Sequence, residues 1–193
     1  MGERDKGKRT VQNALAKKSE PATPADLERI YRQFHGRVLR AAYRITGNSQ
    51  DAEDALQTVF MRLVRREGGA PLSDSPGQYL HRAAINAALD IVRTRRTARS
   101  TPLDDADTVP SDSPQGSPED QHAAREIRDR VRLALARMSP RAAEIFALRY
   151  FEGYANHEIA GLLGTSRSTV NVILHRTRKE LRGEMEPYAG EKR

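Results

Sequence analysis

Apolar side chains recur every three or four residues along most of this chain, which is the period of an amphipathic α-helix. The first such stretch begins at Asp26 and ends at Gly47 and Asn48, residues that stop one helix and cap the next. Its apolar stripe consists of Leu27, Ile30, Tyr31, Phe34, Val38, Leu39, Ala42 and Ile45. The first half of the chain contains only patterns of this kind, so we predict an all-α protein.

Two further helices are expected before residue 100. The second has its cap at Asn48 or Ser49, and acidic residues in its first turn suit the helix dipole. The third begins after Ser75 and Pro76, runs to about Ala98 and ends in the strongly basic stretch "VRTRRTAR". Three helices with a shared apolar side predict a small bundle over residues 26–99.

The segment 100–122 separates this bundle from the rest of the chain. It contains four prolines and six acidic residues but neither Lys nor Arg, which predicts a flexible acidic linker. Composition does not decide between a solvated tether and a segment that mimics nucleic acid in a positively charged channel. Residues 1–25 are expected to form a disordered basic arm, and residues 184–193 a short tail.

The second unit, residues 123–183, ends in a helix-turn-helix pattern. "EIAGLLGTSRSTVNVILHR" at 158–176 has one helix before Gly164, and Ser166 is the expected cap of the next. The N-terminal turns of that second helix would enter the major groove of DNA, where Arg reads guanine and Asn reads adenine. The candidate DNA-binding residues are Ser166, Arg167, Ser168, Thr169, Asn171, Val172, His175, Arg176 and Arg178.

Charge and missing motifs narrow the function further. A net charge of +7 favours a polyanionic partner such as nucleic acid. No catalytic arrangement is recognisable: "HEIAG" at 157–161 lacks the second His of a zinc-protease motif, and no glycine-rich phosphate loop occurs. We therefore expect neither an enzyme nor a bound cofactor or metal. The absence of cysteine, of a signal peptide and of a membrane-spanning stretch favours a cytoplasmic protein without membrane insertion.

In combination, three segments resemble bacterial sigma factors of the extracytoplasmic-function (ECF) group, a branch of the sigma-70 family. "DAEDALQTVFMRLVRR" at 51–66 is similar to region 2.2, and "YLHRAAINAALDIVRTRR" at 79–96 is similar to regions 2.3 and 2.4. Residues 135–182 are similar to region 4. The resemblance implies a region 2 domain at 26–99 and a region 4 domain at 123–183.

This resemblance also implies partners and further site residues. The family's partners are core RNA polymerase, through the clamp helices of its largest subunit, promoter DNA, and in many cases a separate anti-sigma factor. The residues that match the polymerase-binding motif are Asp51, Asp54, Gln57, Phe60 and Arg62, although Phe60 could equally be a core residue. The residues that match the −10 reading and melting helix are Tyr79, Asn86, Asp90, Arg93, Arg95 and Arg96.

Two positions depart from the family pattern. Tyr79 stands where the family commonly has Trp, which weakens any role assigned to that ring. Asn171 and Val172 stand where a basic residue and Ser are common, so the −35 preference cannot be inferred from relatives. The loop from Gly68 to Gly77 corresponds to the family's site for an unstacked promoter base.

Other classes of protein share the helix-turn-helix. The main alternative is a response regulator or repressor that acts without binding core polymerase, and a transposon or phage DNA-binding protein is a more distant one. The helix-only first half disfavours a receiver domain, which would alternate strands and helices. Binding to sigma-free core polymerase separates these alternatives from a sigma factor.

Overall fold

The computed structural model describes residues 23–65, 76–98 and 118–189, and within these ranges the chain is helical without strands. The helices are α2 (Pro24–Thr46), α3 (Ser49–Val64), α4 (Pro76–Ala98), α5 (Pro118–Arg137), α6 (Pro140–Tyr150), α7 (Asn156–Leu162) and α8 (Arg167–Ala189). This confirms the all-α prediction. The basic arm, nearly all of the loop at 68–77 and most of the acidic linker lie outside the described residues.

Local capping chemistry sets the ends of the first two helices. Thr23 and Asp26 form a capping box, so α2 begins at Pro24 and not at Asp26 as predicted. Hydrogen bonds from Thr23 hold the pKa of the Asp26 carboxyl below its ordinary value. Gly47 ends α2 with a left-handed φ of 65°, and the Asn48 side chain accepts a hydrogen bond from the Asp51 backbone N–H to cap α3.

The second unit starts earlier and ends later than predicted. α5 begins at Pro118, so the last five residues of the expected linker are helical; proline is favoured in a first helical turn. Ser139 caps α6, with its hydroxyl oxygen 3.3 Å from the Ala142 backbone N. α8 continues to Ala189 through six residues of the expected tail.

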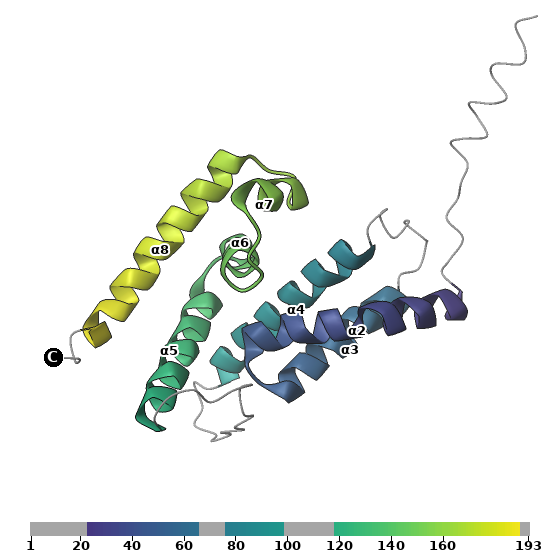
Figure 1. Cartoon of the computed structure of the whole chain (residues 1–193), viewed down its shortest axis with the longest axis horizontal. Coiled ribbons are helices and arrows are strands. Elements are labelled where there is room, and N and C mark those ends of the chain that lie inside the picture. Colours follow the sequence, from purple (N-terminus) through teal and green to yellow (C-terminus); the bar gives the residue numbers. More distant parts are fainter. Residues whose placement is uncertain (1–22, 66–75, 99–117, 190–193) are drawn as a thin grey trace, which may run out of the picture.

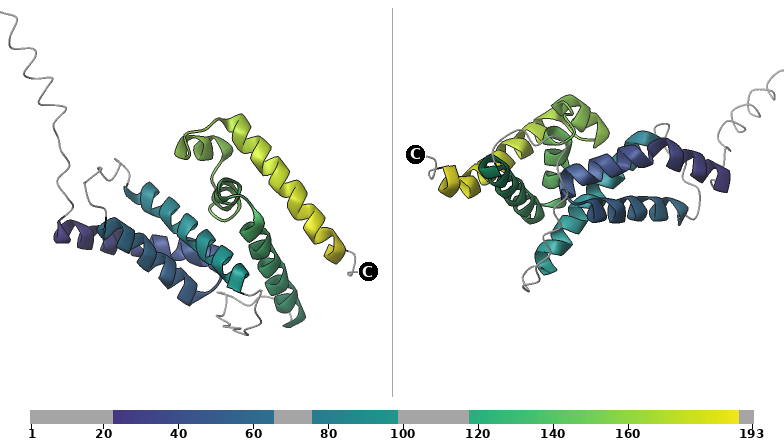
Figure 2. Two further views of the ribbon diagram at one scale, coloured as in Figure 1. Left: turned by 180° about the vertical axis from the view of Figure 1, so that it is seen from behind. Right: turned by 60° about the horizontal axis from the view of Figure 1, so that its bottom comes forward.

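The two units are packed against each other through α4, although sequence patterns predict only separate units on a flexible tether. Helix α4 contacts α2 and α3 of its own unit, and it also contacts α5 and α6 of the second unit. Figures 1 and 2 show α5 and α6 between α8 and the bundle of α2, α3 and α4. Buried side chains such as Ile45, Leu80, Leu135 and Ile145 contribute to one continuous core cluster.

Gly47 lies where α5 meets the end of α2. The Arg132 guanidinium of α5 covers Gly47, and its Nε donates a hydrogen bond of 3.1 Å to the Ile45 carbonyl oxygen. A β-carbon on Gly47 would overlap that guanidinium.

We expect Gly47→Ala to lower the free energy of unfolding by at least about 1–2 kcal/mol, because a left-handed φ strains any L side chain. Urea denaturation followed by circular dichroism measures this change. Gly164→Ala is the matched control, since Gly164 has a φ of 58° with no atom within 4 Å of an added β-carbon. A Gly47→Ala loss no larger than the control's would mean that Arg132 swings aside without cost.

None of the described helices is both long enough and apolar enough to cross a bilayer.

Candidate nucleic-acid and polymerase interfaces

α7, a tight turn and α8 form the helix-turn-helix, as the sequence predicts. Gly164 takes a left-handed conformation in the turn, where the Thr165 N–H donates a hydrogen bond to the Ala160 carbonyl oxygen. Ser166 caps α8, because its hydroxyl oxygen accepts a 3.1 Å hydrogen bond from the Thr169 backbone N–H. The same hydroxyl lies 2.8 Å from the hydroxyls of Ser168 and Thr169.

The two sides of α8 differ sharply in exposure. Val170 and Leu174 are buried against the domain core. All nine candidate residues of the −35 set are exposed: Ser166, Arg167, Ser168, Thr169, Asn171, Val172, His175, Arg176 and Arg178. The face away from the core therefore carries a guanidinium, hydroxyls, an amide and an apolar group, which together can contact phosphates, base edges and a thymine methyl.

Asn171 has an intramolecular partner that the sequence analysis missed. The Asn156 Nδ2 of α7 donates a 2.6 Å hydrogen bond to the Asn171 Oδ1. Reading adenine with both amide atoms uses that same Oδ1, which has a second lone pair and would then accept from both Asn156 and the adenine amino group. No sequence pattern pairs these two residues, because the turn alone brings them together.

The candidate −10 residues on α4 do not form one free surface. Tyr79 and Arg96 are exposed, while the Asp90 carboxylate lies 3.0 Å from Arg93 in an ion pair along the same helix. Arg95 lies 2.7 Å from the Asp51 carboxylate of α3. Asn86 donates a hydrogen bond to Glu144 of the second unit.

The candidate polymerase-binding residues also divide into two groups. Asp54, Gln57 and Arg62 are exposed on α3. Asp51 is only 4% exposed, and its carboxylate pairs with Arg95 of α4. Phe60 is half-buried, and its ring meets the Tyr31 ring edge-on at a centroid distance of 4.9 Å.

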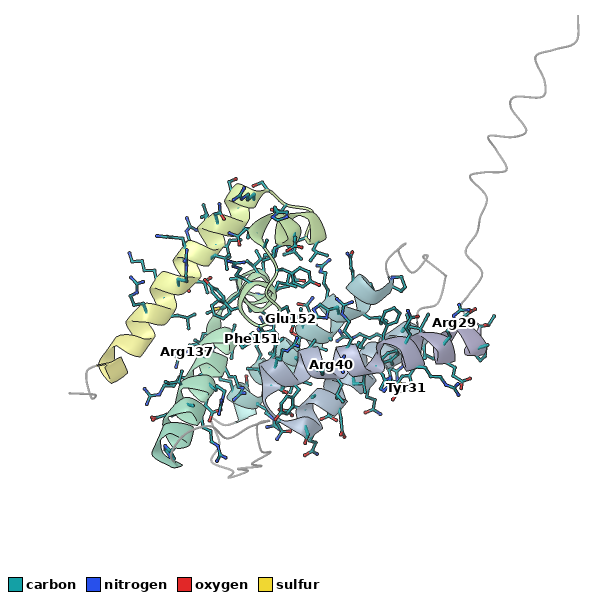
Figure 3. All side chains as sticks on the ribbon, in the orientation of Figure 1. Arg29, Tyr31, Arg40, Arg137, Phe151 and Glu152 are labelled. Carbon is teal, nitrogen blue, oxygen red and sulfur yellow. The ribbon has the colours of Figure 1, made fainter. Side chains whose placement is uncertain are left out.

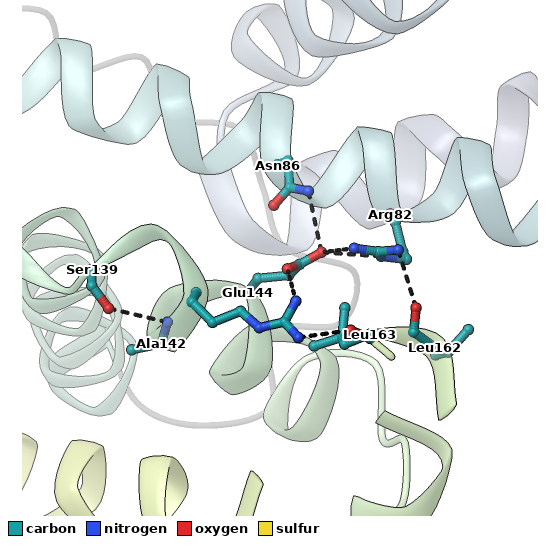
Figure 4. Close-up of polar contacts among 8 residues, drawn as sticks. Arg82, Asn86, Ser139, Ala142, Glu144, Leu162 and Leu163 are labelled. Carbon is teal, nitrogen blue, oxygen red and sulfur yellow. Dashed lines mark hydrogen bonds and ion pairs between the residues drawn. The ribbon is translucent and has the colours of Figure 1, made fainter. Parts of the chain in front are cut away.

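A polar cluster joins α4 to α6, as Figure 4 shows. We call it the Glu144 cluster; it consists of Arg82, Asn86, Arg141 and Glu144. Glu144 Oε1 accepts hydrogen bonds from Arg82 Nε (3.1 Å), Arg82 Nη2 (2.9 Å) and Asn86 Nδ2 (3.2 Å). Arg141 lies 3.5 Å from the other carboxylate oxygen.

The Glu144 cluster reaches the helix-turn-helix itself. Arg82 Nη1 donates to the Leu162 carbonyl oxygen at 3.1 Å, and Arg141 Nη2 donates to the Leu163 carbonyl oxygen at 2.8 Å. Both carbonyls lie at the C-terminal end of α7, where backbone acceptors lack helical partners. Sequence reasoning did not select Arg82 as a site residue. The signal that could have found it is its position four residues before Asn86, on the same helix face.

A second contact between the units centres on Glu152, which Figure 3 places between the two bundles. Its Oε2 lies 2.8 Å from Arg44 Nη1 and 3.1 Å from His81 Nε2, and both Glu152 and His81 side chains are 4% exposed. Burial by itself raises the pKa of Glu152, but the contacts from His81 and Arg44 outweigh it, so the pKa lies below its ordinary value of 4.5.

Metal binding has no support among the described residues, where His, Cys, Asp and Glu nowhere gather in groups of three that could hold an ion. The site is therefore one of exposed recognition groups on α8 and α3, together with a partly covered polar face on α4. Two α-helical units, one of which presents a helix-turn-helix, define a DNA-binding protein.

Comparison with known proteins identifies the family. Residues 30–98 match the model for Sigma-70 region 2, and residues 128–181 match the model for Sigma-70, region 4. The chain belongs to the sigma-70 family of RNA polymerase sigma factors. This confirms the resemblance on which the assignment of regions 2 and 4 was based.

Several similar proteins are named RNA polymerase sigma factors, some of them ECF sigma factors. The chain is 33% identical over 168 residues to ECF RNA polymerase sigma factor SigE of Mycolicibacterium smegmatis, covering 85% of this chain and 63% of the relative. It is 32% identical over 163 residues to RNA polymerase sigma-E factor of Streptomyces avermitilis, covering 83% of this chain and 86% of that relative. RNA polymerase sigma factor YlaC of Bacillus subtilis is 26% identical over 168 residues, covering 86% of this chain and 96% of YlaC.

Proposed function

We propose that this chain is an ECF-type sigma factor that binds core RNA polymerase and directs it to promoters with a −35 and a −10 element. One observation carries the proposal: regions 2 and 4 occur in order in a single chain, and region 4 exposes the reading face of its helix-turn-helix. The chain would act in the cytoplasm as an initiation factor, and the polymerase would perform the chemistry of RNA synthesis.

Region 4 would supply the −35 contact. The first turns of α8 place Arg167 and Asn171 at the end that enters the major groove in helix-turn-helix proteins. His175, Arg176 and Arg178 lie further along the helix and would contact backbone phosphates. Phosphate contacts would supply salt-dependent affinity, and the base contacts would supply selectivity.

Region 2 would supply the −10 contact through α4. Asn86 offers an amide that reads base edges, and Arg93 and Arg96 offer guanidinium groups for phosphates or for stacking on a flipped base. Tyr79 is exposed and offers an aromatic ring for the same purpose. Unstacking a base costs a few kcal/mol, and binding of the flipped base would offset that cost.

α3 would supply the polymerase contact through its exposed residues Asp54, Gln57 and Arg62. The partner surface would be the clamp helices of the largest polymerase subunit. Asp51 and Arg95 would support this surface from inside, because their ion pair joins α3 to α4. A separate anti-sigma factor is a further proposed partner, and it rests on the family alone.

Transcription of the host's genomic DNA tests this function. Sigma-free core polymerase would be supplied with and without the chain, and the transcript starts would be mapped. New starts that share a spaced pair of upstream motifs are expected. No new starts, together with tight DNA binding by the chain alone, would indicate a repressor or response regulator instead.

A further inference from the structure

The packing of region 4 on α4 covers part of the helix that is proposed to read the −10 element. Asn86, which matches the family's −10 helix, donates a hydrogen bond from its amide Nδ2 to Glu144. Arg82, one turn earlier on the same face, binds the same carboxylate oxygen with two guanidinium nitrogens. A promoter strand that approaches these two side chains would meet Glu144 of region 4 first.

Glu144 is an unusual residue for its position. It lies within α6 among the buried residues Ala143, Ile145 and Phe146, and it is itself only 5% exposed. Burying a carboxylate is costly unless cations and hydrogen-bond donors surround it. Two of those groups, Arg82 and Asn86, come from region 2, so the burial of Glu144 is compensated fully only while the two regions are in contact.

The donors that hold Glu144 are of the types that bind DNA. A guanidinium pairs with a carboxylate and with a phosphate in the same two-pronged geometry. An Asn amide likewise donates to a carboxylate oxygen or to a base acceptor. Glu144 thus offers α4 an anionic oxygen acceptor in place of those of the promoter strand.

Two further contacts hold the regions in the same arrangement. Glu152 of region 4 is bound by Arg44 of α2 and lies against His81 of α4. Arg132 of α5 donates to the Ile45 carbonyl oxygen at the end of α2. Arg44 and Arg132 lie on α2 and α5, which contribute nothing to the Glu144 cluster, so the closed arrangement does not depend on one ion pair.

We propose that Glu144 competes with the −10 strand for Arg82 and Asn86. In the free chain, region 4 holds the Glu144 carboxylate against these two side chains, and the carboxylate leaves them when the two regions separate. This inference rests on the proposed function, because it assumes that α4 reads the promoter. It predicts that the free chain binds −10 DNA weakly, since apparent affinity falls in proportion to the fraction of molecules that are open.

Single-stranded DNA binding by the free chain gives the first test. The probe is a fluorescent oligonucleotide that carries the −10 motif found in the transcription experiment. We expect the chain with Glu144→Gln and Glu152→Gln to bind it about 5- to 10-fold more tightly than the unaltered chain does. This is the gain in apparent affinity if about one molecule in ten of the unaltered chain is open and most molecules of the variant are open.

Removing two negative charges also raises DNA affinity without any opening, so the control must carry the same charge change. Glu126→Gln with Glu180→Gln removes two exposed carboxylates of α5 and α8; that of Glu126 pairs with Arg130 of its own helix. We expect less than a twofold gain in affinity for this control. An equal gain in both variants would overturn the proposal.

A distance measurement tests the closed arrangement independently of any promoter. Because the chain has no cysteine, one label each at Glu53→Cys of α3 and at Lys179→Cys of α8 reports the separation of the two regions. We expect one narrow distance distribution for the otherwise unaltered chain, and a broader and longer one after Glu144→Gln with Glu152→Gln. A broad distribution before those substitutions, or a narrow one after them, would contradict the proposal.

Both substitutions are nearly isosteric, and helical circular dichroism with a thermal melt verifies that each variant is folded.

The two proposals fail in different ways. If the chain is not a sigma factor, core polymerase gains no new starts with it, whatever the label distances show. If only the competitor role is wrong, new starts appear while distances and oligonucleotide affinity do not respond to the substitutions.

Discussion

Replacing Arg167 and Asn171 together by Ala is expected to lower transcription from this chain's own promoters by about 30-fold or more, because each good side-chain contact to a base edge contributes about 1–3 kcal/mol and two are removed. Both residues are exposed in the first turns of α8, so their removal leaves the core of region 4 intact. Affinity for core polymerase should not change. Run-off transcription and a core-binding titration of the same variant measure the two effects.

The control for this variant is Arg128→Ala, which removes an exposed guanidinium from α5 of the same region. This variant loses a positive charge without losing a base contact. We expect transcription to fall less than about twofold, because only a non-specific attraction to DNA phosphates is lost. If the Arg167 and Asn171 variant lost polymerase binding as well, the roles given to regions 2 and 4 would be wrong.

Asn156 affects one of the two base-reading candidates on α8. It donates a hydrogen bond to the Oδ1 of Asn171, and bidentate reading of adenine uses that same atom. The orientation of Asn171 in the free chain is therefore set by α7 and not by α8 alone.

Asp54→Ala is expected to have the opposite profile, with about tenfold or greater loss of affinity for core polymerase in the absence of any DNA. Truncating one partner of a buried, hydrogen-bonded charge pair in an interface costs about 2–5 kcal/mol, and Asp54 is proposed to form such a pair with the polymerase. Asp54 is exposed on α3, in the segment that matches the family's docking motif. Titration of labelled core polymerase measures the affinity, and binding of the −35 element by the free chain should not change.

Glu53→Ala is the matched control for Asp54→Ala. Glu53 is also exposed and acidic and is the immediate neighbour of Asp54 on α3, but it points about 100° around the helix from Asp54. We expect it to retain near-normal polymerase binding. Equal losses in the two variants would show that net charge, not a specific face of α3, governs docking.

Most helix ends could be predicted because the interactions that set them are local. Gly47, Asn48 and Ser166 act on backbone groups within a few residues, so capping chemistry marked them correctly. Two helix starts were missed: α2 and α5 begin at Pro24 and Pro118, ahead of the expected starts. The end of α8 was also missed, since that helix continues to Ala189 through the expected tail. In α5 the expected linker composition masked a residue that suits the first turn of a helix.

The candidate site was predictable to different degrees on its two reading helices. On α8, the spacing of Val170 and Leu174 defined the buried side, and every candidate residue proved to be exposed. On α4 and α3, the periodicity did not show which polar residues were already occupied. Asp51 binds Arg95 and Asn86 binds Glu144, and both partners are far away along the chain.

The sequence by itself determined the all-α class and the helix-turn-helix, because each depends on periodicity and capping within one segment. The order of regions 2 and 4 followed from the resemblance of its segments to the sigma-70 family. The tertiary structure alone decided that region 4 rests on α4 and that the carboxylates of Glu144 and Glu152 are buried between the regions. A charged side chain is buried only where distant donors converge on it, and for Glu144 the donors Arg82 and Asn86 lie 62 and 58 residues away. Local pattern carries no information about such partners.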